Sequence, residues 1–343
     1  MDARIHFTGP ARNRLRSAAK LSQSILQVSA RRMLKGPRRP GWNWFMEVGT
    51  RMLKKQVVTA LEMSDVEQSR RYLDSVVISS PPIRAVNITS IVQAKFRGRW
   101  FAAKNAEAAV TVLYLHGGGY CYYPQAYAYF IGLITLAAKS RTFALHYRLT
   151  PEHRFPAQLE DALNAYRWLL ESGTDPDSLV VAGDSAGGNL TLALLLAARG
   201  AKLPPPALAI ALSAPTDFET ERIGNQAFDW IDKRALTQWA DWFCDPAQRG
   251  DPLVSPLRAD LRGLPPIYMQ AGRAEILYDS IQAFADHGKN QGADVVLESW
   301  DDMNHDFQMF GLDAPQSADA LRRIGEVIDV RVRGREKKET ISC

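Results

Sequence analysis

Residues 179–188 read Leu-Val-Val-Ala-Gly-Asp-Ser-Ala-Gly-Gly, and this stretch decides the fold. The apolar residues Leu179–Ala182 predict a short buried strand, which leads directly into the pattern Gly-x-Ser-x-Gly. The residues that follow, 188–199, predict a helix. A serine on such a sharp strand-to-helix turn is exposed near a helix N-terminus, where negative charge is favoured. Ser185 is therefore our candidate nucleophile, and an ordinary N-capping serine on a glycine-rich turn is the alternative.

A second glycine run, His116-Gly117-Gly118-Gly119-Tyr120, follows the predicted strand Val110–Leu115. Three glycines remove three side chains, so backbone N–H groups can point into a cavity. Fixed N–H donors stabilise the negative oxygen that forms during acyl transfer, typically by about 3–4 kcal/mol each. We expect the N–H groups of Gly118, Gly119 and Ala186 to form this oxyanion hole. A phosphate-binding loop is the alternative, but the Lys-Ser/Thr pair that usually completes one does not follow.

Around these two motifs, short apolar runs alternate with helical stretches. The apolar runs have no polar alternation, which is typical of strands buried on both faces. The sequence therefore predicts an α/β fold with a doubly wound, mostly parallel sheet. The predicted strands are 85–93, 100–103, 110–115, 142–147, 179–182, 207–212, 267–270 and 294–298, and the predicted helices are 125–139, 157–172, 187–199, 276–290 and 316–332.

The candidate general base is His305. Six histidines occur in the chain, and this one lies in a predicted loop directly after the last predicted strand, 294–298. In hydrolases whose nucleophilic serine lies on such a strand-to-helix turn, the order along the chain is serine, acid, histidine. His305 fits that order, and its imidazole would take the proton of Ser185 during the attack.

The third member, the acid, is expected just after the preceding strand, 267–270. Glu275 is the first choice, because it follows that strand in the order that such a triad requires. Asp279 is the second choice, although it also fits as a charge in the first turn of the next helix. Asp301 and Asp302 are more distant choices. The acid would hold the imidazole tautomer and stabilise the imidazolium.

Together these residues resemble the hormone-sensitive-lipase branch of the α/β-hydrolases. The resemblance rests on His116–Tyr120, on Gly183–Gly188 and on a third segment, 147–161, which reads YRLTPEHRFPAQLED. Two residues of the third motif depart from the commoner pattern, since His146 and Thr150 replace an aspartate and an alanine. The family more often has Asp than Glu as the acid, so the identity of the acid is less firmly implied than the other two triad members.

The resemblance covers about residues 75–330 and implies ester hydrolysis through an acyl-enzyme, with no metal and no organic cofactor. It also implies a helical cap, which would consist of residues 1–75 and an insertion at about 215–262. The catalytic α/β-hydrolase domain would then occupy 76–343. The cap region is rich in aromatic residues, and Tyr120, Trp42 and Phe218 are candidate substrate contacts, although most such aromatics could equally form cap core.

We expect a carboxylesterase for short- to medium-chain esters, with a small-molecule ester as the substrate. An amide deacetylase or a lactonase on the same triad is the first alternative. A non-catalytic ligand receptor on this fold is the second, but such receptors lose a triad member, and here Ser185 and His305 are both present with an acid candidate.

Composition limits the other function classes. The 343 residues are 46% hydrophobic and 23% charged, which excludes a mainly disordered chain. No uninterrupted apolar run approaches the roughly 18 residues of a membrane span. Three widely spaced cysteines form no disulfide framework, so we expect a reducing, cytoplasmic compartment. The oligomeric state is left open, a homodimer included.

The formal net charge of +5 arises at the N-terminus. Residues 1–40 contain ten Lys/Arg and one acid, so the rest of the chain is slightly acidic, and a nucleic-acid enzyme with a basic groove is not predicted. Leu15–Leu34 has helical spacing of apolar residues, which predicts an amphipathic helix that could contact a membrane surface. A solvated helix packed on the body and a cleaved transit peptide are the alternatives.

Overall fold

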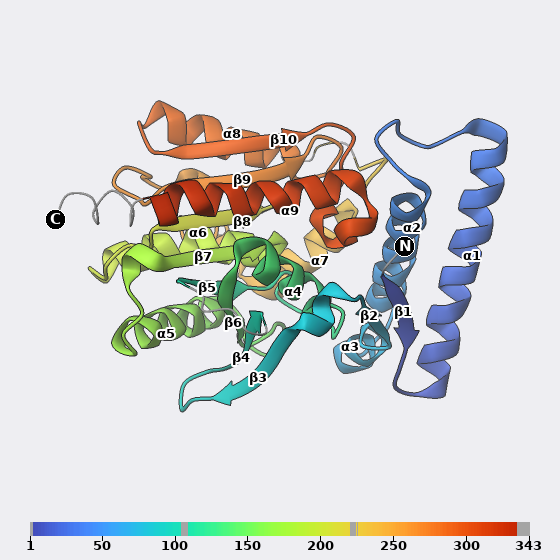
Figure 1. The fold of residues 1–343 in the computed structure, drawn as a ribbon, viewed down its shortest axis with the longest axis horizontal. Helices are drawn as coiled ribbons and strands as arrows, with labels where there is room; N and C mark the ends of the chain where they lie inside the picture. The colour runs from blue at the N-terminus through green and yellow to red at the C-terminus, as the bar shows by residue number, and fades with distance from the viewer. Residues whose placement is uncertain (1–2, 104–108, 220–223, 225, 335–343) are drawn as a thin grey trace.

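The predicted doubly wound sheet is confirmed. The computed structural model describes residues 3–103, 109–219, 224 and 226–334. Its main sheet has eight strands in the order β10-β9-β8-β7-β5-β6-β4-β3 (Figure 1). Neighbouring strands from β10 to β6 are parallel, whereas β4 and β3 pair antiparallel at one edge. The strands are β3 (Val86–Val92), β4 (Arg97–Ala103), β5 (Val110–Leu115), β6 (Ser140–His146), β7 (Leu179–Asp184), β8 (Leu208–Leu212), β9 (Ile267–Gly272) and β10 (Val295–Trp300).

Helices cover both faces of this sheet. The strand β5 shows why, because all its side chains are buried and successive residues point to opposite faces. Val112 and Tyr114 belong to the core under α4 and α9, whereas Leu113 and Leu115 belong to the core under α5 and α6. The helices are α4 (Tyr127–Ala138), α5 (Ala157–Glu171), α6 (Ser185–Gly200), α8 (Tyr278–Asn290) and α9 (Pro315–Ile328).

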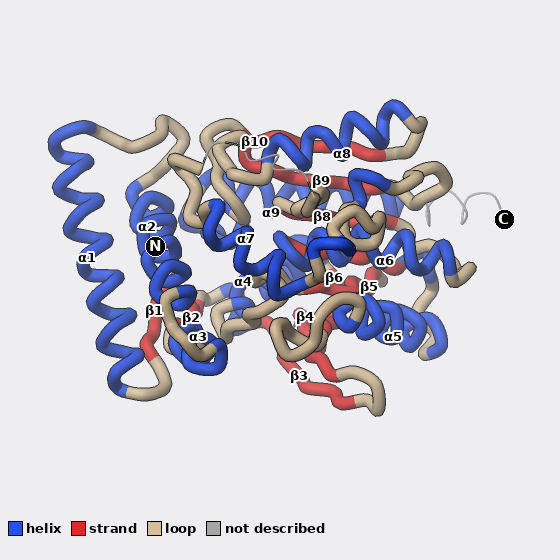
Figure 2. Tube along the Cα trace, turned by 180° about the vertical axis from the view of Figure 1, so that it is seen from behind, coloured by secondary structure: helices blue, strands red, loops and turns tan. Residues whose placement is uncertain are grey.

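The N-terminal residues form a separate layer at one end of the sheet. Helix α1 (Ala11–Lys35) lies outermost, with α2 (Trp44–Leu61) between it and the sheet, as Figures 1 and 2 both show. Helix α3 (Val66–Leu73) follows. A small antiparallel pair, β1 (Arg4–Phe7) with β2 (Val76–Ser79), closes the layer. The sequence pattern had not indicated this pair, because its strands are only four residues long.

The predicted insertion contains α7 (Lys233–Phe243), which contacts α2 (Figure 2). The two segments that were predicted to form a cap therefore touch each other, although the domain boundaries at 75, 215 and 262 stay predictions.

Within the described ranges no helix combines the length and the apolar character that crossing a bilayer requires. Short 3-10 turns lie at Pro82–Ala85, Pro176–Ser178, Pro246–Gln248, Pro256–Arg258 and Phe307–Asp313, and a π-helical turn lies at Asp329–Arg333.

Candidate active site

Ser185 lies at the junction between β7 and α6, with a left-handed backbone conformation of φ 50°. The turn is tight enough to require glycine on both sides. A Cβ atom on Gly183 would lie 2.3 Å from the carbonyl oxygen of Gly187, and one on Gly187 would lie 1.9 Å from the carbonyl oxygen of Leu115. The glycines of the motif are therefore explained by close backbone approach, which brings the serine to the carboxyl end of the sheet.

His305 lies in the loop after β10 and is completely buried. Its Nε2 atom is 2.9 Å from the Ser185 Oγ atom, a hydrogen-bond distance. The indole N–H of Trp230, in the insertion, donates to the His305 carbonyl at 2.7 Å. The structure thus brings the predicted nucleophile and the predicted base into contact across 120 residues of sequence.

Glu275 lies in the loop after β9, and its carboxylate is buried beside the imidazole. One oxygen, Oε2, accepts from the Ser213 hydroxyl at 2.7 Å and from the Gly272 N–H at 3.0 Å. The other, Oε1, is 4.0 Å from His305 Nδ1, and neither of these two buried atoms has a hydrogen-bond partner in the described part of the chain. Catalytic hydrogen bonds are often long in the ligand-free state, so this orientation fits the role of the triad acid.

The other acid candidates lie elsewhere. Asp279 is exposed in the first turn of α8. Asp301 pairs with Arg273 at 2.9 Å, and Asp302 pairs with Arg39 at 2.6 Å. Of the four carboxylates that sequence analysis considered, only Glu275 is near the imidazole.

Asp306 is a second carboxylate at the imidazole, and sequence analysis missed it. Its Oδ2 atom lies 3.2 Å from His305 Nε2, on the side of the ring that faces Ser185. It is buried, its carboxylate oxygens have no hydrogen-bond partner in the described ranges, and its φ is 50°. Its position next to the histidine was the available signal, but the sequence pattern did not show which way its side chain points.

The two carboxylates control the protonation of the histidine. Burial lowers the pKa of His305, but the negative charges of Asp306 and Glu275 raise it by more, so the net pKa is well above the usual value. A general base must be neutral to accept a proton. Asp306 therefore favours the charged, inactive form of the imidazole.

Asp306→Asn is accordingly expected to extend activity to lower pH. Removal of the neighbouring charge lowers the pKa of His305, so the imidazole stays neutral further into acid. The measurement is the pH profile of kcat/KM for a soluble ester, with wild type and variant compared over the same range. An acid limb that stays in place, or that moves to higher pH, would show that Asp306 does not act on His305 in this way.

The glycine run is positioned by Asp184, the residue before the nucleophile. Its carboxylate accepts from the Gly117 N–H at 3.0 Å and from the hydroxyls of Tyr114 and Tyr127 at 2.6 and 2.9 Å. A Cβ on Gly117 would lie 2.2 Å from this carboxylate, so glycine is required there. Burial, together with the charge of Asp306, raises the pKa of Asp184 to about 7.

Of the proposed oxyanion-hole residues, Gly118 and Gly119 have φ values of 98° and 61°, which glycine adopts without strain. Gly119 and Ala186 line the same cavity as Ser185. Gly118 lines a second cavity, and Trp239 lines both cavities. Neighbouring residues of this loop therefore line two cavities, one of which contains the nucleophile.

Asp229, in the insertion, holds the histidine and acid loops together, and sequence analysis missed it. It is buried and accepts from the N–H of Ile276 at 2.7 Å and from the N–H of His305 at 3.3 Å. The pKa of Asp229 is raised to about 7, mainly by burial, with the charge of His305 opposing the rise and that of Glu275 adding to it. Asp229 is one of several aspartates in the insertion, and no sequence motif distinguishes it from the others.

Two cavities meet this site. The first has a volume of about 230 Å³ and contains Ser185 together with Tyr120 and Phe218. The second has a volume of about 440 Å³ and is lined almost entirely by apolar side chains of α1, α2 and the sheet domain. Trp239 lines both cavities. Trp230 lines the second cavity and donates to the His305 carbonyl.

Trp42, a predicted substrate contact, lines neither of these two cavities and is buried. Its ring packs with Met46, Met303 and Phe307, and its indole N–H donates to the Asp302 carbonyl at 2.7 Å. It serves as core between α2 and the histidine loop.

In the described part of the chain, no group of three or more His, Cys, Asp and Glu side chains could hold a metal ion.

Comparison with known proteins agrees with this geometry. Residues 112–309 match the family described as the alpha/beta hydrolase fold. An esterase of Acinetobacter venetianus is 30% identical over 291 residues, which is 80% of this chain and 93% of the relative. An acetyl-hydrolase of Streptomyces hygroscopicus is 36% identical over 220 residues, 63% of this chain and 74% of the relative. A crystal structure of an esterase from the bacterial hormone-sensitive lipase family superposes with a TM-score of 0.69 at 31% identity, covering 92% of this chain and 98% of that chain.

Proposed function

The chain belongs to the α/β-hydrolase family and is a carboxylic ester hydrolase, and on that premise we propose that it hydrolyses short- to medium-chain esters through an acyl-enzyme on Ser185. The observation that carries the proposal is the 2.9 Å contact between Ser185 Oγ and His305 Nε2, beside a small cavity that contains the serine. The relatives include an acetyl-hydrolase, which supports a short acyl group.

In the proposed reaction, Ser185 Oγ attacks the ester carbonyl while its proton passes to His305 Nε2. The Glu275 carboxylate stabilises the resulting imidazolium through Nδ1. The N–H groups of Gly118, Gly119 and Ala186 donate to the oxyanion, which is the largest single contribution in many such sites. His305 then returns the proton to the leaving alcohol, and the acyl group remains on the serine.

Deacylation uses the same groups, with a water molecule in the place of Ser185 as the nucleophile. His305, neutral again, takes a proton from a water molecule, and the resulting nucleophile attacks the acyl carbon. The proton returns to Ser185 Oγ as the acid leaves. Each step needs His305 to alternate between the neutral and the charged form, which is why the two carboxylates near it matter.

The size and lining of the two cavities support the proposed substrate. The 230 Å³ cavity contains Ser185 and is lined by Phe218, Leu236 and Trp239 together with four charged side chains. Its small volume supports a short acyl group. The 440 Å³ cavity is lined by Gly118 and is mainly apolar, so we place the alcohol part of the ester there and the acyl group in the smaller cavity. A scissile carbonyl between the two cavities would lie against the oxyanion loop.

The acyl-chain preference tests this proposal. With p-nitrophenyl esters from C2 to C16, we expect kcat/KM to peak between about C2 and C8, because longer acyl chains exceed the smaller cavity. A panel of matched amides and lactones, measured alongside, should be turned over more slowly. Faster turnover of emulsified long-chain triglycerides than of soluble short esters would contradict the proposal.

A peripheral membrane contact is proposed for helix α1. Its outer face exposes Leu15 at 72%, Leu26 at 70% and Met33 at 87%. These positions are 11 and 7 residues apart, so they lie on one side of the helix. Cationic residues flank this side, including Arg12 and Arg16. An apolar stripe between cationic residues is typical of helices that lie on anionic lipid.

Cosedimentation with vesicles tests this contact. We expect binding to vesicles with anionic phospholipid and little binding to neutral ones, and Leu26→Glu with Met33→Glu should lower the bound fraction roughly tenfold. Val330→Glu is the matched control, because Val330 is 71% exposed on the opposite end of the chain. Hydrolysis of a soluble ester should be unchanged in all variants. Equal binding by the double variant and the wild type would rule out this face.

We also propose a reducing, cytoplasmic compartment. Among the described residues, Cys121 and Cys244 are buried and unpaired, which is usual where thiols stay reduced. Cell fractionation tests this: the protein should appear in the cytosolic fraction, with a salt-releasable share on membranes. Recovery from an oxidising, extracytoplasmic fraction would contradict it.

A further inference from the structure

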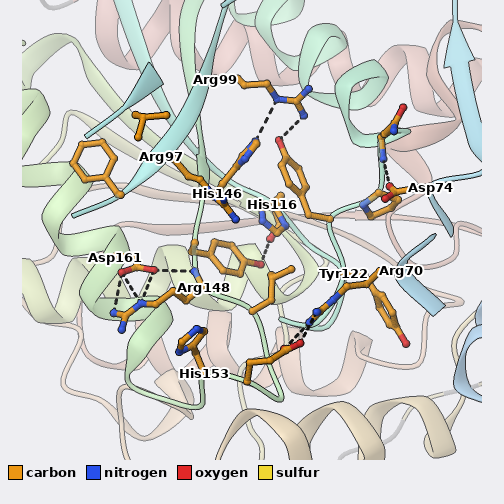
Figure 3. A pocket seen from close by; sticks show the side chains of 18 of the residues that line it. Arg70, Asp74, Arg97, Arg99, His116, Tyr122, His146, Arg148, His153 and Asp161 are labelled. Carbon is orange, nitrogen blue, oxygen red and sulfur yellow. Dashed lines mark hydrogen bonds and ion pairs between the residues drawn. The ribbon is translucent and has the colours of Figure 1, made fainter. Parts of the chain in front are cut away.

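A cavity of about 710 Å³ lies behind the glycine run and plays no part in the proposed reaction. It shares no lining residue with the cavity that contains Ser185. Its walls come from the β3–β4 hairpin, from the end of β6 and the loop after it, and from Tyr122–Gln125 (Figure 3). His116, the residue that precedes the three glycines, lines it as well.

Five cationic and three acidic side chains line this cavity, and the charges are not all paired. Arg70 binds Glu152 at 2.6 Å, and Arg148 binds Asp161 at 2.9 Å. The remaining cations have no carboxylate within 4.0 Å in the part of the chain that the structure describes. They are Lys95, Arg97 and Arg99. The β3–β4 side of the cavity therefore has an uncompensated positive charge.

The sheet geometry explains why these charges meet. Arg97 and Arg99 are two residues apart on β4, so their side chains point to the same face. Arg97 is the direct cross-strand partner of His146 on β6. Arg99 donates through Nε to His146 Nε2 at 3.2 Å and through Nη2 to the Tyr123 hydroxyl at 3.3 Å. Figure 3 shows His146 between the two arginines.

The pKa of His146 reflects the positive charges around it. Burial and the charges of Arg99 and Arg97 together lower its pKa to about 4. The imidazole is therefore neutral at physiological pH. Since Nε2 accepts from Arg99, the ring proton is on Nδ1, which leaves a second hydrogen-bond donor beside the two guanidinium groups. The position often holds an aspartate in the family that the sequence resembles, whereas here no described carboxylate lies within 4.0 Å of the two arginines.

His116 contributes a buried atom that lacks a partner. Its ring is stacked between Tyr123 and Tyr147, with centroid distances of 3.8 and 4.1 Å. Nδ1 is 2.7 Å from the Gly117 carbonyl and so carries the proton, which leaves Nε2 as an acceptor. The residue is 1% exposed, and Nε2 has no hydrogen-bond partner within the described ranges. A buried acceptor of this kind requires a donor, and the cavity that it lines can supply one.

We propose that this cavity is a binding site for a small phosphate monoester that carries a hydroxyl group. The phosphate is a dianion near neutral pH, and Arg97 and Arg99 present the forked donors that bind it bidentately. The hydroxyl group donates to His116 Nε2. With Asp74 counted among the three acids, the five cations leave a net formal charge of +2 on the lining, so the charge balance favours a dianion over a single carboxylate. The volume is within the usual range for small-molecule sites.

Isothermal titration with glycerol 3-phosphate tests the site on the full chain at constant ionic strength. We expect one saturable site, and a Kd that rises at least about tenfold in Arg97→Gln and in Arg99→Gln. His146→Asp places a carboxylate beside both arginines and should abolish binding. Arg84→Gln is the matched control, since Arg84 is an exposed arginine outside the cavity, and its Kd should stay within about twofold of wild type.

Three outcomes would overturn the proposal. One is the absence of saturable binding at millimolar concentrations, and another is an equal loss of affinity in Arg84→Gln, which would indicate unspecific charge attraction. The third is tighter binding of glycerate, the matching carboxylate, than of glycerol 3-phosphate. A ligand-induced rise in Tm in wild type that is lost in Arg97→Gln would support the site independently. Because binding is measured directly, the result does not depend on the esterase reaction.

Discussion

Ser185→Ala is expected to lower kcat/KM for p-nitrophenyl acetate by about 10³-fold or more. The substitution removes the only atom that forms the acyl-enzyme in the proposed reaction, while the oxyanion donors and both cavities remain. Residual activity would come from binding and from the backbone N–H groups alone. The measurement is initial rates over a range of substrate concentrations, with burst kinetics in wild type showing the acyl-enzyme.

Thr237→Ala is the matched control for this experiment. Thr237 also lines the nucleophile cavity and carries a hydroxyl group, but it has no proposed role in the reaction. Its kcat/KM should stay within a few-fold of wild type. Activity that survives in Ser185→Ala would show that another group is the nucleophile. If wild type itself hydrolyses no ester although its fold is intact, the amide, lactone and receptor alternatives gain support.

The sheet could be predicted from sequence because its evidence is local. The strand β5 consists of consecutive apolar residues between turn signals, and it has the predicted bounds, Val110–Leu115. Strand edges were less accurate where polar residues continue the pairing. Strand β4 begins at Arg97, three residues before the predicted strand 100–103, because Arg97 and Arg99 pair with His146 and Ala144 on β6.

The site could be predicted only where a motif or the order along the chain gave a signal. The Gly-x-Ser-x-Gly motif and the glycine run identify the nucleophile and the oxyanion-hole residues directly. The order of the strands along the chain selects His305 and Glu275. Asp229 and Asp306 could not be found in this way. Their roles depend on where a side chain points after the insertion has folded against the histidine loop, and that is long-range information. The position of Trp42 in a buried apolar cluster depends on the same long-range information, since an aromatic residue in a cap segment can face core or cavity.

Glu275→Gln is expected to lower kcat by about 10²–10⁴-fold, with a small effect on KM. For the proposed attack, His305 must accept the Ser185 proton at Nε2, so its own proton must be on Nδ1. Glu275 faces Nδ1 and stabilises that tautomer, and it stabilises the imidazolium as it forms. Glutamine keeps the shape and the hydrogen bonds from Ser213 and Gly272 but loses the charge.

Asp306 makes this prediction sharper, because it lies at the opposite nitrogen. A carboxylate near Nε2 favours a proton there, which is the wrong tautomer for attack by Ser185. With Glu275 neutralised, Asp306 is the remaining charge at the ring, so the loss of activity should be severe. Asp279→Asn is the control for the other acid candidate, and it should leave kcat within about twofold because Asp279 is exposed on α8. A mild effect of Glu275→Gln together with a severe effect of Asp306→Asn would reverse the assignment and make Asp306 the functional partner of the histidine.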